Sequence, residues 1–184
     1  MLFRSKGKKF LNHLSTPADY LLGGWQFNSN TTIQSGLPFD NCFDTGGISD
    51  TGTCRPNVSG DVKTGTTRAS DGSIRFFTDL SVFSAPAVGT FGNQKRSALR
   101  GPGYWRTDAS LFKKFKFTER VEGEFRIESV NFFNHVNLNN PDGFIGKFEN
   151  GKLTPSGGAG LINSTAYGGL DLQRNFQFAF KLKF

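Results

Sequence analysis

The stretch NFQFAFKLKF, residues 175–184, alternates between two kinds of side chain along its whole length. Every second side chain in it is apolar, and amide, methyl or ammonium groups fill the positions between. A period of two is typical of a β-strand with two unlike faces. Chain ends of soluble proteins are usually loosely held, so this stretch predicts a strand whose apolar face lies on lipid or on a core. The apolar positions are Phe176, Phe178, Phe180, Leu182 and Phe184.

Three further segments alternate in the same way, at 23–35, 104–117 and 121–134. With 174–184 they make four predicted strands of 11–14 residues, whereas soluble strands usually have about 5–6. A tilted strand needs about 9–11 residues to cross the hydrocarbon layer of a membrane. The sequence therefore predicts an all-β fold, an antiparallel meander of about four or five transmembrane-type strands that form part of an outer-membrane β-barrel.

Charged residues decide which face of each strand meets lipid. Segment 121–134 carries Phe125 and Ile127 on one face and four charged side chains on the other. Burying those charges in lipid would cost on the order of several kcal/mol, so the charged face is assigned to the lumen. The four charged residues are Glu122, Glu124, Arg126 and Glu128.

Lys113 interrupts the apolar face of segment 104–117. We expect its side chain to extend to water at the strand end, or its position to mark a β-bulge. Aromatic residues also gather near the strand ends, as in the two aromatic girdles of outer-membrane barrels. The predicted girdle residues are Trp25, Tyr104, Trp105, Phe115, Phe117 and Phe133.

The connections between the strands are unequal in length. Residues 118–120 form a short turn, whereas 36–103 and 135–172 are long and rich in Gly, Asn, Asp, Ser and Thr. Outer-membrane barrels have short periplasmic turns and long extracellular loops. With the C-terminus in the periplasm, both long connections fall outside as extracellular loops, and Met1–Phe3 becomes the tail of another descending strand.

Composition narrows the class of protein. The chain has 184 residues, 21 Phe and 36% hydrophobic residues, without an apolar run long enough for a membrane-spanning helix or a signal peptide. Its net charge is +7, but the basic residues are scattered, so no nucleic-acid partner is expected. The alternative to a barrel is a secreted β-sandwich that serves as a binding or adhesion module.

Three stretches resemble the last strands of TonB-dependent outer-membrane receptors, in the subgroup with a carboxypeptidase-regulatory-like N-terminal domain. They are LLGGWQFNSNTTIQSGLPF (21–39), FGNQKRSALRGPGYWRTDASLFKKFKFTERVEGEFRIESVNFFNHVNL (91–138) and FQFAFKLKF (176–184). The resemblance implies a non-enzymatic transport role in the outer membrane. It also implies that the terminal strand, Phe176 to Phe184, is the signal for the barrel-assembly machinery.

The receptor barrels that the chain resembles have about 22 strands. Residues 1–184 are therefore interpreted as a C-terminal fragment of such a barrel. The implied partners are outer-membrane lipid, the remainder of the barrel with its plug, and the barrel-assembly machinery. Contact with TonB is implied only through an N-terminal part that the fragment lacks.

Few residues carry candidate chemistry. Cys42 and Cys54, twelve positions apart in a predicted extracellular loop, are expected to form a disulfide rather than two free thiols. His13 and His135 have no metal-ligand partners at a suitable spacing, and no catalytic, cofactor-binding or metal-binding set emerges. A calcium site in loop 36–103 is a weaker alternative to ordinary turn chemistry. Its ligands would be Asp40, Asn41, Asp44 and Asp50.

Overall fold

The computed structural model of the chain describes residues 2–3, 16–46, 54–77, 79–166 and 173–184. They fold mainly into β-strands, with a short helix α1 (Thr16–Leu22), so the all-β prediction is confirmed. The chain divides into two compact units. The sheet unit comprises Met1–Ile33, Trp105–Val136 and Leu170–Phe184, and the loop unit comprises Gln34–Tyr104 and Asn137–Gly169.

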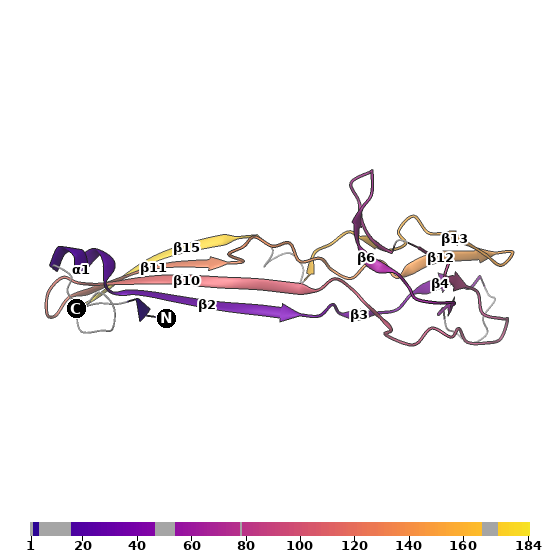
Figure 1. Cartoon of the computed structure of the whole chain (residues 1–184), viewed down its shortest axis with the longest axis horizontal. Helices are drawn as coiled ribbons and strands as arrows, with labels where there is room; N and C mark the ends of the chain where they lie inside the picture. The colour runs from indigo at the N-terminus through magenta and orange to yellow at the C-terminus, as the bar shows by residue number, and fades with distance from the viewer. Residues whose placement is uncertain (1, 4–15, 47–53, 78, 167–172) are drawn as a thin grey trace. The chain divides into compact units, whose positions relative to one another are not determined.

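The sheet unit contains one five-stranded sheet in the order β1–β2–β10–β11–β15, whose long strands run side by side in Figure 1. Spatial order follows chain order, as predicted for a meander, and β1 occupies the place expected for an additional strand. The strands are β1 (Leu2–Phe3), β2 (Trp25–Gln34), β10 (Tyr104–Lys116), β11 (Glu122–Val130) and β15 (Asn175–Lys183).

The register of the sheet confirms the predicted division into two faces. In the antiparallel pair β11–β15, Phe125 lies opposite Phe180, and the neighbouring Glu124 lies opposite Lys181. Because side chains alternate across a strand, the two aromatic rings share one face and the two charged groups share the other.

Strand β11 is shorter than expected, ending at Val130 rather than at residue 134. Asn131 has a φ of 50°, a left-handed conformation that breaks the strand. Its carboxamide then bonds the backbone of His135, accepting from the N–H at 3.0 Å and donating to the C=O at 2.9 Å. Asn131 therefore closes a turn that the alternating pattern could not reveal.

Strand β2 begins where its backbone approaches β10 closely. The Lys114 N–H donates to the Gly24 C=O at 3.1 Å. Gly24 has a φ of 71°, and a Cβ there would lie 2.8 Å from the Lys114 carbonyl oxygen. Both the backbone angle and the available space therefore require glycine at this position.

The loop unit corrects the expectation that 36–103 and 135–172 are plain loops, because both contain short strands. Strand β4 of the first connection pairs in parallel with β12 of the second, and β7 pairs antiparallel with β14. The two connections thus fold together. Their strands are β3 (Pro38–Phe39), β4 (Cys42–Asp44), β5 (Asn57–Val58), β6 (Thr64–Arg68), β7 (Ile74–Phe77), β8 (Phe83–Ser84), β9 (Leu99–Arg100), β12 (Phe144–Glu149), β13 (Lys152–Pro155) and β14 (Leu161–Ile162).

Two apolar clusters stabilise the loop unit. One is centred on Phe43 and Ile145, which are 2% and 0% exposed, and the other on Phe76 and Phe77. Val62 packs against both clusters. Burying a large apolar side chain contributes about 1.5–3 kcal/mol, so the loop unit has a core of its own.

A disulfide joins Cys42 and Cys54 beside the first cluster. The intervening Phe43 is buried, and its N–H donates to the Cys54 carbonyl at 2.9 Å. The disulfide and this hydrogen bond hold the two ends of the segment together at the edge of the core.

Candidate membrane-facing surface

One face of the sheet unit presents apolar side chains at matching levels on neighbouring strands. Phe125 lies opposite Phe180, and Ile127 lies between Leu111 of β10 and Phe178 of β15. Phe178 and Phe180 are 64% and 56% exposed. An exposed apolar surface that continues across strands is unfavourable in water and suits contact with lipid.

Strand β15 carries the apolar residues of the terminal stretch on this same face. It is an edge strand of the described sheet, and all its residues are exposed. Phe184 follows the end of the strand. The exposed fractions are 50% for Phe176, 64% for Phe178, 56% for Phe180, 46% for Leu182 and 94% for Phe184.

The opposite face is lined by ion pairs. Arg126 approaches Glu124 at 3.4 Å and Glu128 at 3.7 Å, while Lys114 of β10 lies 4.0 Å from Glu124. Arg126 also lies over the Phe112 ring, 4.5 Å from its centroid. Exposed ion pairs stabilise a fold by only about 0–1 kcal/mol each, so their main significance is that they mark the water-facing side.

Lys113 contradicts the sequence-based expectation. Only 2% of it is exposed, so it does not extend to water. The β10–β11 register also runs from Ala109 to Lys116 without a shift, so there is no bulge between these two strands. The Lys113 ammonium instead donates to the carbonyl oxygens of Leu21, at 3.2 Å, and Gly23.

Helix α1 and the residues that follow it enclose this ammonium. The Trp25 ring centroid lies 5.2 Å from Lys113 Nζ, and Trp25 Nε1 donates to the Leu21 carbonyl at 2.9 Å. The Tyr20 hydroxyl donates to the Lys116 carbonyl, which attaches α1 where β10 ends. Carbonyl oxygens and an aromatic face together satisfy the charge on an otherwise apolar surface.

We expect Lys113→Met to detach α1 from the sheet. A hydrogen bond to a charged group contributes about 1.5–3 kcal/mol, and the substitution removes two of them. Amide hydrogen exchange should therefore accelerate at 20–24 while β11 stays protected. Lys114→Met is the matched control, because the Lys114 side chain is 60% exposed on the opposite face and its ion pair with Glu124 is 4.0 Å long. Equal exchange at 20–24 in both variants would contradict this role for Lys113.

The predicted girdle residues lie at the two ends of β10. Near its start, Trp105 stacks on His135 with centroids 4.2 Å apart, and Phe133 lies 5.9 Å from Trp105. Near its end, Phe115 and Phe117 stack at 6.3 Å. Tyr104 begins β10, and Trp25 begins β2, close to Lys113 at the opposite end. Their use as membrane girdles remains a prediction.

Two of the candidate calcium ligands, Asp40 and Asp44, accept hydrogen bonds from backbone N–H groups, whereas Asn41 is buried and its side chain has no hydrogen-bond partner among the described residues. Asp40 Oδ1 accepts from the Ser97 N–H, and Asp44 Oδ1 accepts from the Gly46 N–H at 3.0 Å. Asp50 and His13 lie outside the described residues. Within the described ranges, no group of three or more His, Cys, Asp or Glu side chains could hold a metal ion.

Ionisable groups on the loop unit are held in their charged forms. Lys147 and Glu149 form a 2.7 Å ion pair on β12. The hydrogen bond between them raises the pKa of Lys147 and lowers the pKa of Glu149. Hydrogen bonds from Ser73 likewise lower the pKa of Asp71. These side chains therefore keep their charges near neutral pH.

The match to a known protein family agrees with contact between the apolar face of the sheet unit and lipid. No helix in the part of the chain described by the structure is long and apolar enough to cross a membrane. No curated protein and no solved structure gives a significant match to the chain. A family model described as "Outer membrane beta barrel domain" matches residues 4–177, which does not favour the alternative of a secreted β-sandwich. The chain therefore belongs to the outer membrane β-barrel domain family, and its location is the outer membrane.

Proposed function

We propose that the chain forms the C-terminal barrel strands of a TonB-dependent outer-membrane receptor. The proposal rests on the segment LRGPGYWRTDASLFKKFKF, residues 99–117, with FNHVNL at 133–138. This resemblance indicates the subgroup with a carboxypeptidase-regulatory-like N-terminal domain. The proposed role is transport without catalysis, in which the sheet unit forms part of the barrel wall and the loop unit is extracellular.

Additional strands are the first partners that this proposal requires. Strands β1 and β15 are the two edges of the described sheet. Lipid cannot satisfy the backbone N–H and C=O groups of an edge strand, so membrane sheets close into barrels. The remaining strands, the plug and the TonB-contacting segment would belong to an N-terminal part of the receptor.

The gene and a binding experiment test the proposal together. Reading the gene upstream of residue 1 should reveal a plug domain and further barrel strands in the same frame. The receptor encoded by that longer frame should bind the periplasmic domain of TonB, and should lose this binding when its TonB-contacting segment is deleted. An upstream frame without a plug domain, or TonB binding that survives the deletion, would exclude this function.

We also propose that β15 with Phe184 is the strand recognised by the barrel-assembly machinery. An edge strand can pair its backbone with a template strand by β-augmentation, while its apolar face turns to lipid. In the full receptor, replacing both Phe180 and Phe184 by Asp should lower the amount of heat-modifiable folded barrel in the outer membrane. The control Lys183→Gln changes the other face and should have little effect. Normal assembly of the double variant would rule out this role.

A further inference from the structure

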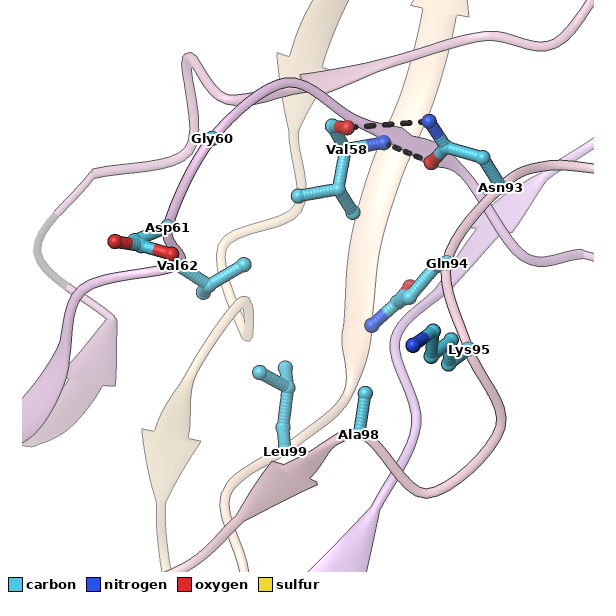
Figure 2. A pocket seen from close by; sticks show the side chains of 9 residues that line it. All are labelled: Val58, Gly60, Asp61, Val62, Asn93, Gln94, Lys95, Ala98 and Leu99. Atoms are coloured by element: carbon cyan, nitrogen blue, oxygen red, sulfur yellow. Dashed lines mark hydrogen bonds between the residues drawn. The ribbon is translucent and has the colours of Figure 1, made fainter.

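The loop unit contains a pocket of about 670 Å³, shown in Figure 2. Val58, Val62 and Leu99 supply its apolar walls. Each of them also packs against one or both buried clusters of the loop unit, so the walls are fixed from behind. The volume lies in the range of small-molecule sites, about 300–1,000 Å³.

Gln94 is the polar group that distinguishes this pocket. The residue is 5% exposed, yet its side-chain oxygen and nitrogen have no hydrogen-bond partner among the described residues. Figure 2 shows its side chain directed toward the space enclosed by the lining residues. Both atoms are covered in the free chain, with less than 1 Å² of each exposed. Buried polar side chains are nearly always hydrogen-bonded, so a ligand that displaces the covering side chains would meet an unpaired donor and acceptor here.

The backbone of Gln94 is held firmly by a neighbouring segment. Its N–H donates to the Pro56 carbonyl at 3.3 Å, and the Arg55 guanidinium donates to its carbonyl at 3.4 Å. A Cβ on Gly92 would lie 2.1 Å from the Arg55 carbonyl oxygen, so the two segments are packed backbone to backbone. Cys54 precedes Arg55, which connects the position of Gln94 to the disulfide.

The neighbouring residue Asn93 shows how a side-chain carboxamide in this loop binds a peptide backbone. Its Oδ1 accepts from the Val58 N–H at 2.7 Å, and its Nδ2 donates to the Val58 carbonyl at 3.2 Å, as drawn in Figure 2. One side chain thus bonds both main-chain polar groups of one residue. Gln94, the next residue along the chain, carries the same donor and acceptor without partners.

We propose that this pocket binds a short peptide, with Gln94 bonding the N–H and C=O of one peptide residue. An apolar side chain of that residue would pack against Val62 and Leu99. Asp61 and Lys95 are exposed at the pocket, and neither forms an ion pair with another described residue. Their opposite charges suit the ammonium and carboxylate ends of a peptide. The proposal goes beyond the receptor function and does not depend on TonB.

The tripeptide Ala-Leu-Ala is the probe that tests this proposal on the whole 184-residue chain in detergent micelles. Its control is the analogue in which an ester oxygen replaces the leucine N–H, so that only the donor is lost. The side-chain amide resonances of Gln94 should shift on addition of the tripeptide. The ester analogue should bind about tenfold more weakly, as expected for the loss of one hydrogen bond to a buried partner.

Gln94→Leu separates recognition from stability. It removes both polar atoms while keeping a similar volume, so the loop unit should unfold at the same or higher temperature and tripeptide affinity should fall at least about tenfold. Gln173→Leu, the same substitution in an exposed segment outside the loop unit, should leave affinity unchanged. Absence of a Gln94 shift with the tripeptide, or equal binding of the ester analogue, would overturn the proposal even if the Gln94 variant failed to fold. Retained affinity in a folded Gln94→Leu chain would overturn it as well.

Discussion

Phe178→Arg is expected to destabilise the membrane-inserted protein by about 2–4 kcal/mol, the cost of placing an arginine on the lipid face near the middle of a bilayer. Phe178 lies near the centre of β15, opposite Ile127 of β11, and is 64% exposed in the chain alone. The guanidinium of the new arginine would have to bend away from the lipid-facing side of β15 to reach water. The measurement uses the full receptor folded into lipid vesicles, in which β1 and β15 have partner strands. Urea titration followed by tryptophan fluorescence should show a lower midpoint with an unchanged slope.

The adjacent position supplies the control for this substitution. Gln177 lies on the other face of β15, opposite Glu128. Gln177→Arg adds the same charge one residue away, beside an acidic side chain, so its effect should stay within about 0.5 kcal/mol. Equal destabilisation by both arginines would show that the two faces of β15 meet the same surroundings.

Loss of the Cys42–Cys54 disulfide should destabilise the loop unit by about 3 kcal/mol, the chain-entropy value for a loop of roughly this length. Replacing both cysteines by serine removes the covalent link between the two ends of the segment. Those ends are then joined by the 2.9 Å hydrogen bond from the Phe43 N–H to the Cys54 carbonyl. Hydrogen exchange should accelerate at Phe43 and Ile145, the most buried residues of the first cluster.

The sheet unit serves as the internal reference for that experiment. Amides of β11 should exchange at the same rate with and without the disulfide, because the bond lies entirely within the loop unit. Unchanged protection of Phe43 and Ile145 in the double serine variant would show that the cluster holds the loop unit without the disulfide.

The sheet was predictable because its information is local to each strand. Alternation places Phe125 and Glu124 on opposite faces whatever the partner strand. Strand length separates a membrane strand from a soluble one, and connection length separates a periplasmic turn from an extracellular loop. The end of β11 was missed because a left-handed asparagine, Asn131, interrupts a pattern that otherwise continues.

The remaining features depend on contacts between residues distant in sequence. The role of Lys113 could not be predicted because the carbonyls that its ammonium bonds, those of Leu21 and Gly23, belong to a segment about 90 residues earlier. The parallel pairing of β4 with β12 likewise joins two different connections through strands too short to show a period. Gln94 carries no signal in the sequence, since only burial distinguishes its unpartnered amide from any surface glutamine.

Nitroxide scanning of β15 tests whether the apolar face of the sheet unit contacts lipid. Single cysteines at 176–183, labelled without reductant so that the native disulfide stays intact, would report accessibility to oxygen, which concentrates in lipid, and to a polar nickel complex, which stays in water. We predict an oxygen-rich signal at positions 176, 178, 180 and 182 and a nickel-rich signal at the positions between them. Accessibility without a period of two, or with the two sets exchanged, would contradict the account.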